Sequence, residues 1–137
     1  MQINFLAIIL AAVAQFVVGA VWYSALFGKL WGRIHGFDKL SKETQQEMMS
    51  KMGPFYGIQA FVTLITAIVF WLFVNYTGWN PFGLAAFFWL GFVVPAQVSA
   101  VIFGGTEPKW LVKKIAVQSG ASLACLLAAA VVFHFLA

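Results

Sequence analysis

Uncharged hydrogen-bonding side chains are the residues of this sequence best placed to do chemistry, because they interrupt otherwise apolar segments. Each of four such segments holds one glutamine, and most of the nearby Trp, Tyr, Ser and Thr residues lie toward one end of their segments. An amide side chain offers two donors and an acceptor, which suits it to an uncharged polar molecule. The candidate polar cavity consists of Gln15, Trp22, Tyr23, Ser24, Gln59, Thr63, Gln97, Ser99, Gln118 and Ser122.

Two interpretations of this polar set stay open at the level of sequence. The side chains can line a cavity that is open to the cytoplasm and filled by water or a small neutral ligand. They can also form a hydrogen-bond network that holds helices together, at about 0.6 kcal/mol for each bond within a membrane.

Metal, redox and nucleophilic chemistry has little support in the sequence. His35 and His134 are expected on opposite faces of the membrane, so they cannot share a metal ion or a haem. Cys125 is the single cysteine, which excludes an intrachain disulfide and suggests a packing residue. Since no catalytic or phosphate-binding motif is present, we expect no metal, no cofactor and no catalytic residue. An enzyme that acts on a lipid-phase substrate remains a third alternative.

The elements that must position these residues are membrane helices. The chain has 137 residues, of which 63% are hydrophobic and 9% charged, whereas soluble domains carry about a quarter charged residues. All 12 charged side chains lie in 29–51 and 107–114. The uncharged runs 1–28, 52–106 and 115–137 therefore predict an integral membrane protein with one domain, 1–137.

The predicted fold is an all-α four-helix bundle, because the backbone must satisfy its own hydrogen bonds within lipid. Thr77-Gly78-Trp79-Asn80-Pro81 is typical of a turn and divides the long central run into two helices. The first run is expected to be retained, because no basic residue precedes it as in a signal peptide. The fourth helix can begin earlier than its apolar run if Thr106 caps it and Pro108 lies in its first turn. The expected spans are 3–27, 55–76, 82–103 and 115–135.

The charges also predict the topology. Short loops rich in Lys and Arg stay cytoplasmic, so both charged loops are expected inside and both termini outside. The net charge of +4 then faces the membrane surface, which predicts contact with anionic lipid and not with nucleic acid.

The first charged loop is expected to contain a short amphipathic helix over 41–52. Ser41 can cap its N-terminus, and Glu47 and Lys51 form a favourable i,i+4 pair. Leu40, Met48 and Met52 fall on one face, which suggests a helix in the membrane interface that faces lipid, the bundle or a partner.

Small residues at four-residue spacing predict where helices pack closely, within one chain or between copies of it. Pro95 frees a helix carbonyl and predicts a kink. We therefore expect a homo-oligomer. The candidate packing residues are Ala7, Ala11, Gly19, Gly91, Pro95, Ala116, Gly120 and Ala124.

The segment 19–31, GAVWYSALFGKLW, ends the first apolar run with a Gly-x-x-Trp-Tyr-Ser…Phe-Gly-Lys-x-Trp pattern. This pattern resembles the family catalogued as domain of unknown function 1761, and the similarity extends over nearly the whole chain. The resemblance implies a small four-helix protein of the bacterial inner membrane and supplies no activity. In physical terms, Gly19 lets a helix approach, Trp22 and Tyr23 anchor at the interface, and Ser24 bonds back to its own helix. Alternatively, the three polar side chains belong to the cavity.

Two functions are compatible with these features. The first is a channel- or carrier-like protein for a small neutral solute, which the converging polar side chains suggest. The second is a non-catalytic structural or accessory membrane protein that binds lipid or a partner protein, which the small-residue stripes and the loop helix suggest.

Overall fold

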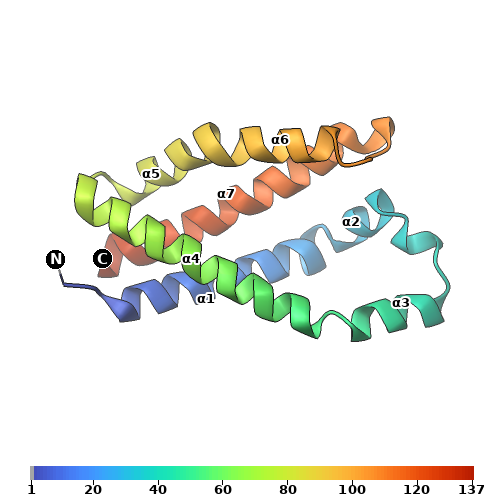
Figure 1. The fold of residues 1–137 in the computed structure, drawn as a ribbon, viewed down its shortest axis with the longest axis horizontal. Coiled ribbons are helices and arrows are strands. Elements are labelled where there is room, and N and C mark those ends of the chain that lie inside the picture. Colours follow the sequence, from blue (N-terminus) through green and yellow to red (C-terminus); the bar gives the residue numbers. More distant parts are fainter. Residues whose placement is uncertain (1) are drawn as a thin grey trace.

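Four long helices form an antiparallel bundle in the computed structural model, which describes residues 2–137 (Figure 1). The first and third long helices each contain a short π-helical turn, and shorter helices lie in the first charged loop. The elements in chain order are α1 (Phe5–Val21), a π-turn (Trp22–Leu26), α2 (Gly28–Ile34), a 3₁₀ turn (Phe37–Lys39), α3 (Lys42–Ser50), α4 (Gly53–Thr77), α5 (Pro81–Phe88), a second π-turn (Trp89–Val93), α6 (Val94–Ile102), a second 3₁₀ turn (Pro108–Trp110) and α7 (Leu111–Leu136).

The helices confirm the prediction of an all-α bundle with four membrane-length spans. By length and apolarity, the candidate spans are Phe5–Leu26, Gly53–Thr77, Pro81–Ile102 and Pro108–Leu136. The largest difference from the predicted bounds is at the fourth span, which begins at Pro108 and so includes three lysines in its first turns. Thr106 does not cap this span: the residue before Pro108 is Glu107, and its side chain makes no capping bond.

Both chain termini lie at one end of the bundle, and the charged loops lie at the other (Figure 1). The Asn4 amide donates to the Leu136 carbonyl at 2.6 Å, and its oxygen accepts from the Ala7 N–H at 3.1 Å, so one side chain caps α1 and joins the termini. We call the end of the bundle that holds the two termini the terminal end, and the end that holds the charged loops the charged end. Their separation is the arrangement that a four-span topology with two charged loops on one side requires.

The buried apolar core fills the half of the bundle nearer the terminal end. Its largest fully buried side chains are Phe70, Trp71, Leu84 and Phe133. Ala7 and Ala11, which have no exposed surface, let α1 approach the other helices, as their spacing predicted.

The second charge-free run divides where the sequence predicted a turn. Gly78 adopts φ +67°, which ends α4 in the left-handed conformation that favours glycine. The Asn80 side chain then caps α5 by accepting from the N–H groups of Phe82 and Gly83, and Pro81 occupies the first turn.

Helix α7 lies at the centre of the bundle and packs against α1, α5 and α6. Helix α4 packs against α1, and in Figure 1 it diverges from α6 toward the charged end. The part of the bundle nearer the charged end is therefore less tightly closed than the part that holds the apolar core.

Each π-turn replaces the usual i→i−4 bond with a longer i→i−5 bond. The Phe27 N–H donates to the Trp22 carbonyl at 2.8 Å, and the Val94 N–H donates to the Trp89 carbonyl. Pro95 has no N–H to continue the regular ladder, which explains why the second π-turn stands directly before it. The expected irregularity at Pro95 thus takes the form of a wider helical turn.

The loop helix is confirmed as α3, which begins one residue later and ends two residues earlier than predicted. Ser41 caps it by accepting from the Thr44 N–H at 3.2 Å, and Lys51 pairs with Glu47 at 3.0 Å. Met48 is 47% exposed.

The predicted small-residue contacts are only partly present within the chain. Besides Ala7 and Ala11, Gly19 lies against α7, and Gly120 lies against Trp22 of the first π-turn. Gly91, Pro95 and Ala116 are exposed instead, and Ala124 is half-buried. For the three exposed residues, packing between copies of the chain stays a prediction, because small-residue spacing marks a smooth helix face without indicating what covers it.

Candidate functional site

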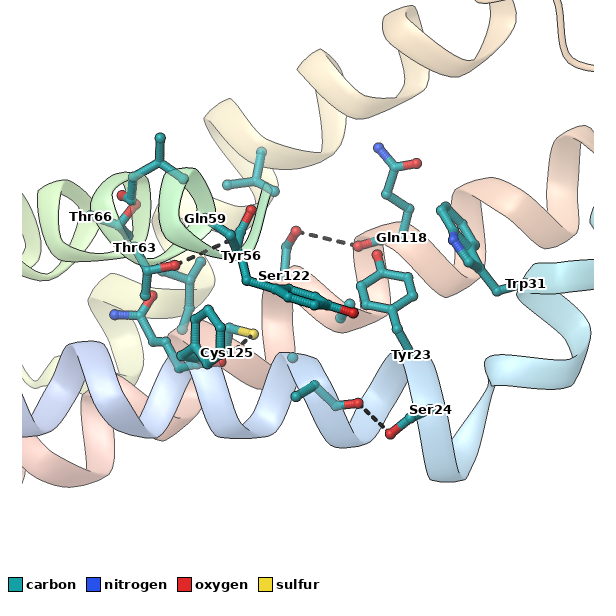
Figure 2. A pocket seen from close by; sticks show the side chains of 18 of the residues that line it. Tyr23, Ser24, Trp31, Tyr56, Gln59, Thr63, Thr66, Gln118, Ser122 and Cys125 are labelled. Carbon is teal, nitrogen blue, oxygen red and sulfur yellow. Dashed lines mark hydrogen bonds between the residues drawn. The ribbon is translucent and has the colours of Figure 1, made fainter. Parts of the chain in front are cut away.

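A cavity of about 1060 Å³ lies between α1, α4, α6 and α7 in the half of the bundle nearer the charged end (Figure 2). It extends from Gln15, near the middle of the first span, to Trp31 and Met49 beside the charged loop. On its inner side it reaches Leu126, which belongs to the apolar core. Phe70, Trp71 and Phe133 fill the bundle beyond this point, so the cavity is blind toward the terminal end.

The four candidate glutamines all line this cavity, one from each long helical segment. Two of them bond within their own helix: Gln15 Nε2 donates to the Ala11 carbonyl at 3.3 Å, and Gln59 Nε2 donates to Thr63 Oγ1 at 3.2 Å. Their amides therefore add no tie between helices.

Gln97 is the glutamine that joins two helices. Its Nε2 donates to Ser122 Oγ on α7 at 2.7 Å, and Ser122 Oγ donates onward to the Gln118 carbonyl at 3.3 Å. Gln97 Oε1 is buried and has no hydrogen-bond partner among residues 2–137. An unpaired buried amide oxygen is costly, so a movement of the amide that exposes this atom to the cavity would let it accept a bond from a bound molecule.

The cavity brings together eight of the ten candidate residues from the sequence, and two lie elsewhere. Tyr23, Ser24, Thr63, Ser122 and the four glutamines line it. Ser99 is exposed on α6 and does not line it. A serine hydroxyl can bond to its own helix, so this residue type does not reveal which face of a membrane helix is buried.

Trp22 is the second candidate that does not line the cavity. Its ring lies over Gly120, where an added Cβ would come within 2.8 Å of Cζ2, and its Nε1 donates to the Val117 carbonyl at 2.9 Å. Trp22 therefore joins the first span to α7. Gly120 leaves the space that the indole occupies.

Trp89 makes the matching contact from the third span, and sequence reasoning missed it. Its Nε1 donates to the Ser119 carbonyl at 2.8 Å, two residues from the carbonyl that Trp22 contacts. Both tryptophans begin a π-turn. A tryptophan inside an apolar span was the available signal, because its N–H needs a partner there.

Several further lining residues were not among the candidates. Tyr56 and Thr66 extend from α4, and Trp31 packs edge-on against Tyr23 with ring centroids 4.9 Å apart (Figure 2). Cys125 packs against Gly19 as expected of a packing residue, yet it also lines the cavity, and its Sγ donates to the Gln15 carbonyl at 3.3 Å.

The lining contains no Asp, Glu, Lys, Arg or His within the described part of the chain. Its polar groups are amides, hydroxyls and one thiol, set among apolar and aromatic side chains. Such walls can bind an uncharged molecule that carries both hydrogen-bonding and apolar groups.

Comparison with known proteins adds one finding. The model of a family described as "Protein of unknown function (DUF1761)" matches residues 6–134. No curated protein and no solved structure matches the chain.

Proposed function

Because the chain belongs to the DUF1761 family, which supplies no activity, we propose a function from its own geometry: carrier-like binding of a small uncharged polar solute. The observation that carries this proposal is the convergence of all four glutamines on one cavity whose walls bear no charge. The proposed solute enters from the charged end, which the positive-inside rule predicts to face the cytoplasm.

Gln97 lines the cavity and its Oε1 has no partner among the described residues, which supports recognition of a hydrogen-bond donor on the solute once the amide turns toward the cavity. Amides donate and accept without carrying charge, so they can replace the hydration of a neutral polar group. Proton- or ion-coupled transport usually uses an ionisable residue in the membrane, and no Asp, Glu, Lys or Arg lies in 52–106 or 115–137. These features favour uncoupled movement of a neutral molecule.

The blind end of the cavity favours a carrier over an open pore. A continuous water path through one chain would have to pass the buried Phe70, Trp71 and Phe133. A carrier instead exposes one binding site to the two sides of the membrane in turn.

Uptake into liposomes of the purified full-length chain tests the proposal. A panel of uncharged radiolabelled solutes is compared for wild type, Gln59→Leu and the control Ser99→Ala, whose side chain lies outside the cavity. Gln59 is the sharper choice because its amide bonds only within α4, so its loss should leave the fold intact. We expect uptake of at least one solute, with about a tenfold loss in Gln59→Leu and no change in Ser99→Ala.

Two results of this assay would contradict the proposal. Uptake no faster than in empty liposomes across the panel would contradict carriage, and equal uptake by Gln59→Leu and wild type would contradict recognition in this cavity.

A structural or accessory role is the second candidate, favoured by the smooth exposed face that Gly91 and Pro95 form on the third span. An added Cβ at Gly91 would meet nothing within 4 Å, so this face has room for a second helix. This role predicts a homo-oligomer in nanodiscs that Gly91→Leu dissociates while solute uptake is absent. A monomeric wild type would contradict it.

A further inference from the structure

A second, smaller cavity of about 300 Å³ lies at the charged end, between the end of α2 and the turn that precedes α7. Gly36 closes α2 with φ +73°, and Gly105 turns the chain after α6 with φ +75°. Both glycines line the cavity, so the two turns that shape it depend on a left-handed conformation that other residues rarely adopt. We call this cavity the basic pocket.

The basic pocket concentrates positive charge that is not neutralised by the chain. Arg33, Lys39 and Lys114 line it, and none of them forms a salt bridge within residues 2–137. The acidic side chain in the lining is Glu107, whose carboxylate lies 3.5 Å from Lys109 Nζ. The pocket therefore has an excess of cations over anions.

Two further polar groups of the pocket can still form hydrogen bonds. Thr106 Oγ1 is buried without a hydrogen-bond partner among the described residues, which is unfavourable unless something binds there. His35 Nδ1 lies 2.9 Å from the Trp31 carbonyl. A carbonyl can only accept, so Nδ1 carries the proton, and Nε2 of the neutral ring can accept a hydrogen bond from a protonated phosphate oxygen. A hydroxyl and an imidazole thus stand beside the three cations.

We propose that the basic pocket binds a phosphate group. A guanidinium and two ammonium groups match the charge of a phosphate, and the guanidinium can donate two parallel bonds to its oxygens. The Thr106 hydroxyl can donate to a third oxygen. The source is either a phospholipid headgroup, which the membrane-boundary position suits, or a soluble phosphate; the site chemistry is the same for both.

This site does not depend on the proposed carrier function. Lys114 Nζ lies 5.9 Å from the centre of the Trp31 ring, and Trp31 lines the large cavity, so the two cavities share one wall. The phosphate contacts themselves involve no residue of the glutamine-lined cavity.

The test uses the full chain in nanodiscs and two adjacent lysines as a matched pair. Lys114 lines the pocket and Lys113 does not, although both carry the same charge on the same helix. Inorganic phosphate is titrated calorimetrically in phosphatidylcholine nanodiscs, and retention of phosphatidylglycerol is measured by native mass spectrometry. We expect Lys114→Gln and Arg33→Gln to weaken binding about tenfold, Lys113→Gln to change it less than twofold, and Lys114→Arg to restore it.

The two probes separate the sources. Saturable binding of inorganic phosphate supports a soluble phosphate ligand, and selective retention of phosphatidylglycerol that depends on Lys114 supports a headgroup site. Equal weakening by Lys113→Gln and Lys114→Gln would show a diffuse surface charge and overturn the pocket. Absence of binding of both probes to the folded wild type would also overturn it.

Discussion

Replacing Gly120 by Ala tests the contact that joins the first span to α7. The added Cβ would lie 2.8 Å from Trp22 Cζ2 and 3.2 Å from Cη2, whereas carbon atoms in contact prefer about 3.5–4.0 Å. The indole cannot swing away freely, because its Nε1 bonds to the Val117 carbonyl at 2.9 Å and its ring packs on Phe27 with centroids 4.7 Å apart. The substitution therefore strains this contact and disrupts the hydrogen bond.

The expected change in the free energy of unfolding is the sum of three contributions. Overpacking of a well-packed site costs about 1–3 kcal/mol, and loss of a hydrogen bond within the membrane adds about 0.6 kcal/mol. Replacing glycine by alanine within a helix returns about 1 kcal/mol. We expect Gly120→Ala to lower the free energy of unfolding by about 1–2 kcal/mol.

Gly57→Ala is the matched control, because an added Cβ there meets nothing within 4 Å and should leave stability unchanged or slightly raised. Unfolding by sodium dodecyl sulfate in mixed micelles, followed by circular dichroism, gives both values. In a Trp22→Leu background the cost of Gly120→Ala should vanish, since the two side chains then no longer meet. Equal stability of Gly120→Ala and Gly57→Ala would refute this account of the contact.

Three further predictions concern the tie to α7, access to the cavity and the topology. Trp89→Phe removes the bond to the Ser119 carbonyl and should lower the free energy of unfolding by about 0.6–1.7 kcal/mol; an unchanged value in the same micelle assay would contradict a stabilising role. Cys125 lines the cavity, so a water-soluble thiol reagent should modify it from the charged end and not from the terminal end of the protein in proteoliposomes; modification from the terminal end alone would contradict a cavity that is blind there. Cysteines introduced at Lys42 and Lys109, after removal of the native cysteine, should be labelled from the cytoplasmic side only; external labelling of either would reverse the predicted orientation.

The number and order of the spans were predictable because charge is excluded from lipid and marks the loops directly. The polar set was largely predictable for a related reason, since an amide such as that of Gln97 avoids lipid and turns toward other helices. Ser99 was misplaced because a hydroxyl is small enough to be satisfied by its own helix, so it can face outward.

The packing of individual faces was not predictable from apolar residues. Phe61 is 64% exposed on α4, whereas Phe70 on the same helix is 1% exposed. Lipid accepts an apolar side chain as readily as a protein core does, so the pattern that distinguishes inside from outside in soluble helices is missing here. The first π-turn was also not predictable, because no proline marks it. The bond from Trp22 to the Val117 carbonyl joins residues that are far apart in the sequence, so it could not be predicted from local pattern.

The hydrogen bonds of the cavity separate the two interpretations that the sequence left open. A network that holds the bundle together must cross between helices, and the bond from Gln97 to Ser122 does so. The amides of Gln15 and Gln59 bond within their own helices, so they contribute nothing to the association of helices. Within the described residues, every hydrogen bond that an α4 side chain donates stays on α4, which leaves apolar packing to hold this wall. Exchanging the bond between Gln59 and Thr63 for a bond to a solute would therefore change the stability of the fold little, which favours the cavity interpretation on the α4 side. Between α6 and α7, the bond from Gln97 to Ser122 favours the network interpretation.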